Sequence, residues 1–298
     1  MLVGILLTLF IGFLWSLVGG AYKFVAKENL SVFDIALVSG FLSFLVLVAL
    51  LGWNFHSADA AVVPDAGFCW LVIGGGCINA AGGYVLQWSM KYCRSSVAWA
   101  IGQSALIIPF LSITLIFSEP WYALKVIGTA VIVGGMLVLS CSPSKKTEEM
   151  PRPAYGIMLA LVAFLVLGIG QAMLSSASYL SFEDAVGFRP VLSSVGGFFA
   201  IIGGKIAMKE KSFRITKKAL YVIVFYLVQG VITQTTQFFA MDSLAEVGMN
   251  ACFFPIAIGT CIALYSVWSV VVFKESTNRY VIGGTAAIVC GIAAYCFC

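Results

Sequence analysis

The chain has 298 residues, of which 61% are hydrophobic and only 10% are charged, and its mean hydropathy is +1.03. A soluble domain of this length would carry about 25% charged residues, so the composition excludes an ordinary water-soluble protein. The formal net charge of +4 does not indicate nucleic-acid binding, because the basic residues lie in short connecting segments and not on one folded face.

Apolar stretches about as long as a bilayer is thick fill the chain almost from end to end. A helix needs roughly 20 apolar residues to cross the hydrocarbon core, and in lipid its backbone polar groups must bond within the segment. The sequence therefore predicts ten transmembrane helices, at 2–22, 33–52, 67–89, 95–117, 121–141, 154–176, 185–206, 218–240, 247–272 and 279–298. The first stretch lacks a basic start and a small-residue cleavage site, so we interpret it as a span and not as a removable signal peptide.

Basic residues are shared unevenly between the connecting loops. The loops after odd-numbered spans hold most of them: Lys23, Lys27, Lys91, Arg94, Lys145, Lys146, Arg152, Lys205, Lys209, Lys211, Arg214, Lys217, Lys218, Lys274 and Arg279. The loops after even-numbered spans are acidic: Asp59, Asp65, Glu119, Glu183, Asp184, Asp242 and Glu246, with Lys125 nearby. Because cytoplasmic loops collect Lys and Arg, we expect a multi-pass protein of a bacterial-type inner membrane with both termini on the extracytoplasmic side.

The two halves of the chain are similar to each other. A polar cytoplasmic linker at 142–153 separates the first five spans (1–141) from the last five (154–298). A shift of 150 residues places Asp34 on Asp184 and Gln87 on Gln237, and a shift of 156 places the segment 117–135 on 273–291 with matched Phe, Glu, Gly and Thr residues. Because five is an odd number, the second half must enter the membrane from the opposite side. The fold class predicted is an all-α integral membrane protein of ten helices in two inverted five-helix repeats.

Uncharged polar side chains form a stripe on one helix of each half. Asn79, Gly83 and Gln87 recur every four residues, and Gln229, Thr233 and Gln237 do the same 150 residues later. Such residues either join helices by hydrogen bonds or line a polar cavity, and the matched stripes favour a cavity. Gln103 and Asn250 are further candidates for that cavity, and Gln171 and Gln234 are weaker ones.

Arg189 is the one charged side chain clearly inside a predicted span, whereas the others lie near span ends, and Pro190 follows it. A guanidinium in lipid is costly, so it needs a partner or a wet surface. One interpretation is that Arg189 extends to the outer surface and pairs with Glu183 or Asp184. The alternative is that Arg189, with Asp184, provides a counter-charge or a gate in an outer vestibule.

Several kinds of chemistry are disfavoured by what the spans contain. Nine cysteines without a CxxC pair and a single histidine, His56, predict neither disulfides nor a zinc site, and we expect no cofactor. The acids Asp34, Glu119, Asp184 and Glu275 lie at span ends, which weakens proton symport, and we interpret Glu119 and Glu275 as partners of helix N-terminal dipoles. The sequence therefore predicts no enzyme, and the absence of a phosphate-binding loop excludes an ATP-driven pump.

The closing helix of each half carries a family resemblance. A glutamate followed by a glycine-rich helix (Glu119 with GTAVIVGGMLVLS, Glu275 with GGTAAIVCGIAAY) resembles the end of each repeat in the drug/metabolite transporter superfamily, in its ten-span EamA-like form. The segments MKYCRSS at 90–96, QFFAMDSLAEVG at 237–248 and FKES at 273–276 resemble the rhamnose–proton symporter and related sugar-uptake proteins. The resemblance implies a central cavity lined by spans 1–4 and 6–9, with spans 5 and 10 outside it.

The leading hypothesis is a secondary transporter that moves a small polar metabolite, sugar-like in preference, by alternating access. Its expected substrate-binding residues are Asn79, Gln87, Gln103, Gln229, Thr233, Gln237 and Asn250, and its expected gating residues are Arg189 and Asp184. The expected partners are the lipid bilayer, the solute and a coupling proton or Na+, and the protein is expected to be a monomer or homodimer. The alternatives are an exporter of amino acids or drugs, a non-transporting scaffold and a membrane-embedded enzyme.

Overall fold

The computed structural model of this chain describes residues 1–28, 30–57, 64–93, 95–141, 152–180, 187–207, 213, 215–272 and 277–298. Within these ranges the chain forms helices and no strand, which confirms the all-α class. The first half contains α1 (Leu2–Lys27), α2 (Val32–Ser57), α3 (Ala66–Ser89), α4 (Ser95–Gln103), the 3-10 turn η1 (Ser104–Leu106), α5 (Ile107–Ile116) and α6 (Ala123–Ser140). The second half contains α7 (Pro153–Leu180), α8 (Phe188–Ala207), α9 (Lys217–Ala245), the 3-10 turn η3 (Asn250–Cys252), α10 (Phe253–Val271) and α11 (Arg279–Tyr295).

Every predicted span corresponds to helical chain. Among the described residues, nine helical segments are long and apolar enough to cross a membrane, and α11, with 17 residues, is a shorter apolar helix. The fourth span consists of α4, η1 and α5 in succession, so its α-helical hydrogen bonding is interrupted midway by one 3-10 turn. The eighth span is longer than expected: α9 continues to Ala245, so Asp242 lies in a helix and not in a loop.

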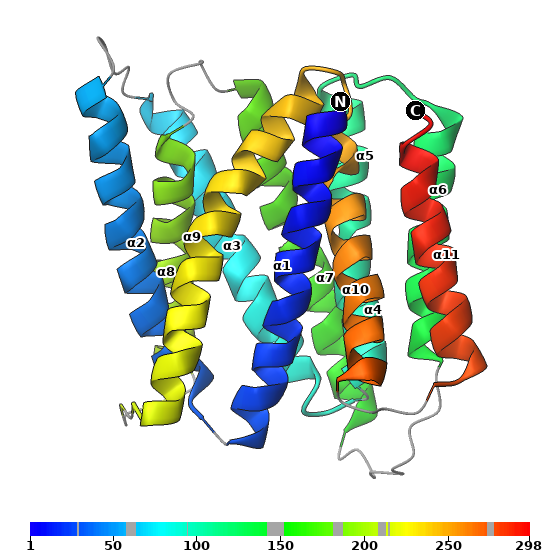
Figure 1. Cartoon of the computed structure of the whole chain (residues 1–298), viewed down its shortest axis with the longest axis horizontal. Coiled ribbons are helices and arrows are strands. Elements are labelled where there is room, and N and C mark those ends of the chain that lie inside the picture. Colours follow the sequence, from blue (N-terminus) through cyan, green and yellow to red (C-terminus); the bar gives the residue numbers. More distant parts are fainter. Residues whose placement is uncertain are drawn as a thin grey trace.

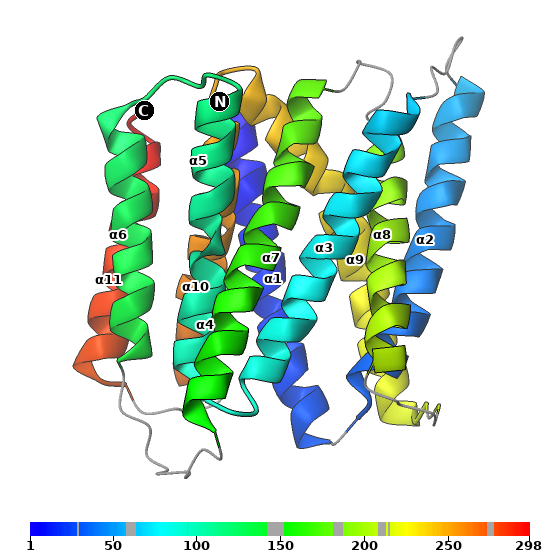
Figure 2. The same cartoon turned by 180° about the vertical axis from the view of Figure 1, so that it is seen from behind.

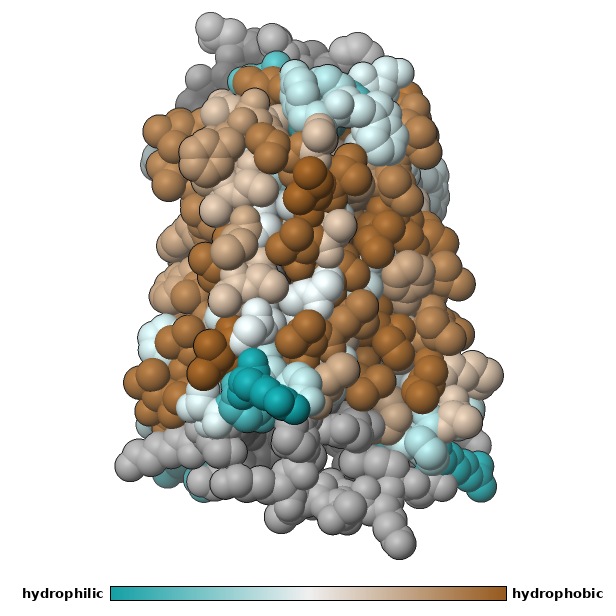
Figure 3. Space-filling model, turned by 90° about the vertical axis from the view of Figure 1, so that its right-hand side faces the viewer, coloured by the Kyte–Doolittle hydropathy of each residue, from teal (hydrophilic) through white to brown (hydrophobic). Residues whose placement is uncertain are grey.

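The outer surface of the bundle is apolar. Large hydrophobic side chains such as Leu115, Ile116, Leu165 and Val289 are more than half exposed. On the face formed by the α6–α11 side of the molecule, hydrophobic residues cover most of the surface and hydrophilic residues gather near its two ends (Figure 3). A surface of this kind suits a lipid environment and identifies the chain as a multi-pass membrane protein.

The helices cross the bundle in alternating directions (Figures 1 and 2). α1 starts at the end of the molecule where both termini lie, and α2 returns to that end. α7, the first helix of the second half, starts at the opposite end, so α1 and α7 run in opposite directions. α6 therefore ends, and α7 begins, at the end of the molecule that is distant from the termini.

The helix contacts divide the bundle into a main body and a lateral pair. α3 packs against α7 and α8, α1 packs against α9 and α10, and α2 packs against α8 and α9. α6 and α11 pack against each other at one side of the molecule (Figure 1). Residues of α9 and α10 contribute most to the largest buried apolar cluster, which also contains residues of α6 and α11 and so joins the lateral pair to the main body.

Adjacent glycines in the helices have different surroundings. A Cβ atom on Gly196 of α8 would lie 2.0 Å from the carbonyl oxygen of Ile73 in α3, whereas a Cβ on Gly197 would meet nothing within 4 Å. The same contrast separates Gly135, whose Cβ would lie 2.7 Å from the oxygen of Gly284, from Gly134. One glycine of each pair thus lies at a close backbone crossing between helices, and its neighbour faces open space.

This contrast gives a matched pair of substitutions. Gly196→Ala should destabilise the protein by about 1–3 kcal/mol, because the backbone of α3 must move to admit the methyl group. Gly197→Ala should be neutral or should stabilise by up to about 1 kcal/mol, because alanine favours the helix and meets no neighbour. The measurement is the thermal unfolding temperature in detergent. Equal effects of the two substitutions would contradict this packing of α3 on α8.

Candidate functional site

The predicted amide stripes lie on helices that pack on different neighbours. Asn79 and Gln87 belong to α3 and are partly buried, and Gln103 is the partly buried last residue of α4. On α9, Thr233 and Gln237 are buried, and the partly buried Gln229 donates its Nε2 hydrogen to Thr233 Oγ1 at 2.9 Å. α3 lies against α7 and α8, while α9 lies against α1 and α2. No hydrogen bond of the described residues joins one stripe to the other, so their convergence on one solute stays a prediction.

A third polar stripe runs along α7. Gln171, Ser175 and Ser178 are separated by four and three residues, so they lie on one face of the helix, with Tyr179 beside them. Gln171 and Ser175 are 5% and 1% exposed. The spacing was visible in the sequence, but a serine hydroxyl commonly bonds a carbonyl of its own helix, so the stripe carried no clear functional pattern.

Asn250 joins this stripe from the start of the ninth span. The residue is 1% exposed, and its Nδ2 atom donates to the backbone oxygen of Ser175 at 2.9 Å. Several polar atoms around this contact are buried and have no hydrogen-bond partner in the described part of the chain: Asn79 Oδ1, Gln171 Oε1, Ser175 Oγ and Asn250 Oδ1. Buried polar atoms are almost always satisfied, so these four oxygens call for hydrogen-bond partners from outside the described part of the chain.

Arg189 has a different partner from the two that the sequence suggested. Its guanidinium is 0% exposed and donates through both terminal nitrogens to the two carboxylate oxygens of Asp242, one of them at 2.8 Å. The hydroxyl of Ser178 accepts a further hydrogen bond at 3.2 Å, and the guanidinium lies 5.2 Å from the ring centre of Phe238. Extension of Arg189 to the outer surface is therefore wrong, because the side chain is enclosed by α7, α8 and α9. Asp184 and Glu183 lie outside the described residues.

A second ion pair ties the other end of α8. Lys205, in the last turn of α8, pairs with Asp34 in the first turn of α2. Asp34 is 1% exposed, although it begins a span. Thus one helix is held by charge at both ends, to α9 near the end that carries the termini and to α2 at the opposite end (Figure 1).

A buried charge cluster also surrounds Glu119. Lys125, in the first turn of α6, donates to Glu119 Oε2 at 3.2 Å and to the oxygen of Gly248 at 2.5 Å, and both charged side chains are 1% exposed. Glu119 also accepts hydrogen bonds from the Tyr179 hydroxyl and from the backbone N–H of Ala251 at 3.2 Å. Glu119 therefore accepts a hydrogen bond from a helix N-terminus, as the sequence predicted. The N-terminus is that of η3, however, and not that of α6, the helix that follows Glu119 in the chain.

The two clusters meet at the end of α7. Ser178 contacts Arg189 and the next residue, Tyr179, contacts Glu119. The ring of Tyr179 also stacks on Phe117 at 4.4 Å. The last turn of α7 is therefore fixed between the Arg189–Asp242 pair and the Glu119–Lys125 pair, and we call this arrangement the α7 clamp. It lies one to two turns beyond Gln171 and Ser175, toward the end of the molecule that holds the termini.

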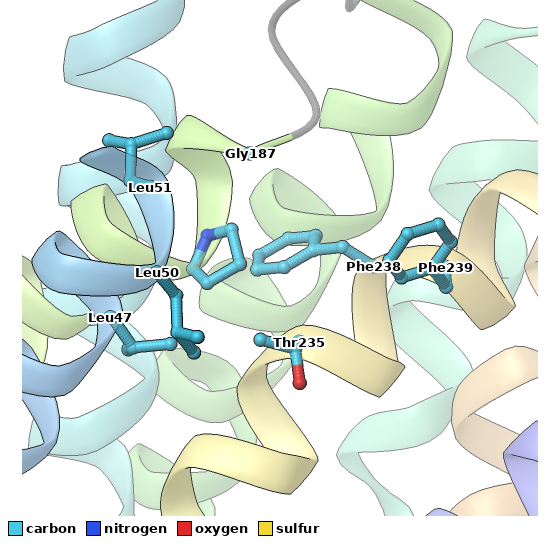
Figure 4. Close-up of a pocket in the computed structure, with 8 residues that line it drawn as sticks. Leu47, Leu50, Leu51, Gly187, Thr235, Phe238 and Phe239 are labelled. Carbon is cyan, nitrogen blue, oxygen red and sulfur yellow. The ribbon is translucent and has the colours of Figure 1, made fainter. Parts of the chain in front are cut away.

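An apolar cleft of about 260 Å³ lies beside the clamp. Leu47, Leu50 and Leu51 from α2 face Thr235, Phe238 and Phe239 from α9 across it (Figure 4). Gly187 and Pro190 complete the lining, and Phe238 is the residue that contacts Arg189 on its other side. None of the predicted substrate-binding residues lines this cleft, and its lining offers a polar solute little except the Thr235 hydroxyl.

Comparison with known proteins identifies the fold without a family. No family model matches the chain, and no curated protein matches it. Twenty-eight chains of solved structures match. One of them, described only as "Crystal structure of protein", superimposes with a TM-score of 0.73 at 13% identity, over 99% of this chain and 96% of its own length. At this identity the match establishes a shared fold over the whole chain.

The cluster around Glu119 gives a stability prediction. Lys125→Met leaves a buried carboxylate without its counter-charge and should cost about 3–5 kcal/mol, whereas Lys125→Met combined with Glu119→Gln should recover part of that loss. Lys218→Met is the matched control, because Lys218 is 60% exposed in its pair with Glu28 and should contribute less than about 1 kcal/mol. Thermal unfolding in detergent measures all three, and equal losses for Lys125 and Lys218 would contradict the buried cluster.

Proposed function

We propose that the chain is a secondary transporter that carries a small, neutral, polar solute, sugar-like in preference, by alternating access. The observation that carries the proposal is the presence of buried, unpartnered amide and hydroxyl groups inside a bundle whose exterior is apolar. Polar side chains at membrane depth are costly unless they serve a solute path or join helices. The side-chain oxygens of Asn79, Gln171, Ser175 and Asn250 bond to no other described residue, so a polar solute or water is their natural partner.

The contacts of the two halves support an inverted repeat. In the two halves α1 corresponds to α7, α2 to α8, α3 to α9, and α4 with α5 to α10. The α1–α10 contact then corresponds to the contact of α7 with α4 and α5, and the α2–α9 contact corresponds to the α8–α3 contact. The α2–α8 contact and the α6–α11 contact each join a helix to its own counterpart in the other half. Counterpart helices such as α1 and α7 run in opposite directions (Figure 2). A two-fold axis in the membrane plane would generate both relations, and transporters built in this way bind the solute between the two repeats.

The ion pairs of α8 supply the gates in this proposal. Arg189–Asp242 closes one end and Lys205–Asp34 the other, and each pair joins α8 to a helix that a rocking motion would separate. Asp242 is the partner of Arg189 among the described residues, which do not include Asp184. The sequence-based orientation agrees with this arrangement, since Lys91, Arg152, Lys205 and Arg279 all lie at the end distant from the termini, which we assign to the cytoplasm. On this basis we keep the drug/metabolite transporter resemblance as part of the proposal.

Uptake by proteoliposomes tests the function and the predicted stripes together. Wild-type protein should take up at least one radiolabelled sugar from a panel of neutral pentoses and hexoses, and Gln87→Ala with Gln237→Ala should lower kcat/KM about tenfold or more, because two amide partners of the solute are lost. Thr235→Ala is the control and should leave uptake unchanged, because Thr235 lies on the helix face opposite Gln237 and its hydroxyl donates to the Val231 carbonyl oxygen. Absence of uptake for the whole panel would reject a sugar-like solute, and unchanged uptake by the double variant would reject the stripes.

A further inference from the structure

We propose that Gln171, Ser175 and Asn250 form a subsite that receives hydrogen bonds from the hydroxyl groups of a neutral, polyhydroxylated solute. None of these residues belongs to the two matched amide stripes, and two of them lie on α7, which the stripes do not include. The inference rests on the proposed transport function and specifies which buried groups select the solute.

The three side chains of the subsite are buried and have oxygens without hydrogen-bond partners. Gln171, Ser175 and Asn250 are 5%, 1% and 1% exposed, and each has a buried side-chain oxygen without a hydrogen-bond partner. The three are also neighbours: Gln171 and Ser175 are one turn apart on α7, and Asn250 is bonded to the backbone of Ser175. A group of unsatisfied oxygens in one place is unfavourable unless hydrogen-bond donors meet it.

The hydrogen bond of Asn250 determines which end of its amide group is available to a solute. A backbone carbonyl can only accept hydrogen bonds, so the Asn250 atom that faces the oxygen of Ser175 at 2.9 Å must be the NH2 group. The Asn250 amide is thereby held in one orientation, and its oxygen is left as an acceptor. The solute must therefore present a donor at this point, as a hydroxyl group does.

The surroundings of the subsite carry no unpaired charge along α7. The charged groups nearest to the subsite through the α7 clamp are already paired, Arg189 with Asp242 and Lys125 with Glu119. The three subsite side chains are themselves neutral, so no net charge remains to select an ionic solute. A hydroxylated neutral molecule satisfies the acceptors without an unpaired charge inside the membrane, whereas an amino acid would bring two charges.

The subsite borders the contact between the two halves. Asn79 of α3 lies directly against Gly170 of α7, where an added Cβ would come within 2.5 Å of the Asn79 backbone nitrogen. Asn79, whose Oδ1 is also unpartnered, thus lies beside the residue that precedes Gln171, where α3 of the first half packs on α7 of the second. A solute at this border contacts both halves, as alternating access requires.

The test is a double-mutant cycle between protein acceptors and sugar hydroxyls. Wild type, Asn250→Ala, Ser175→Ala and Gln171→Leu are purified, and binding of D-glucose, D-xylose and singly deoxygenated glucoses is measured by thermal shift and by competition of uptake. Each variant should weaken sugar binding roughly five- to tenfold. For one deoxy sugar, the loss of binding affinity caused by Asn250→Ala and the loss caused by the missing hydroxyl should not be additive, because both changes remove the same hydrogen bond.

Thr260→Val is the matched control. Thr260 is 8% exposed and its hydroxyl is also unpartnered, but it lies at the contact of α10 with Gly12 of α1. It should leave sugar binding unchanged. A purely structural role for the subsite predicts lower unfolding temperatures with unchanged sugar affinity, and that result overturns the proposal, as does additive loss with every deoxy sugar. Hydroxyl-dependent binding without flux would uphold the subsite and reject the transport function. Sugar flux that all three variants leave unchanged would uphold the transport function and reject the subsite.

Discussion

The constraint on which this structure depends is that charge and hydrogen-bonding capacity inside a membrane protein need partners from the same protein. Arg189 is the clearest case, since its guanidinium is completely enclosed and is matched by both oxygens of Asp242. Breaking such a pair by removing one partner is far more costly than the pair is stabilising. The relative placement of α7, α8 and α9 near the termini follows from that pairing.

The α7 clamp shows how a few polar residues organise many apolar ones. Ser178 and Tyr179 connect two ion pairs that bring together α6, α8, α9 and the start of η3. Glycines act in the complementary way, because close crossings such as Gly196 on Ile73 let helices approach where no polar bond is made. The apolar side chains then fill the bundle and face lipid, while Gln171 and Ser175 of α7 keep buried oxygens without a partner among the described residues.

The sequence predicted the helices well and their pairing poorly. Length and hydropathy located all ten spans, because both are local properties. The Arg189–Asp242 pair was not predicted, because Asp242 is 53 residues away and the hydrophobic run, which ends before the helix does, assigned it to a loop. Lys125 and Gly248 are 123 residues apart, so periodicity could not reveal their contact. Within Gly196–Gly197, only the three-dimensional crossing decides which glycine is required.

The most direct test of an alternating, polar interior is the accessibility of one cysteine on α7. In a variant without the native cysteines, Ser175→Cys is exposed to a membrane-impermeant maleimide from each side of oriented vesicles. The account predicts that Asp242→Asn increases labelling from the side of the termini and that Lys205→Met increases labelling from the opposite side, because each substitution breaks the ion pair at one end of α8. Absence of labelling from both sides, or labelling that Asp242→Asn leaves unchanged, would contradict it.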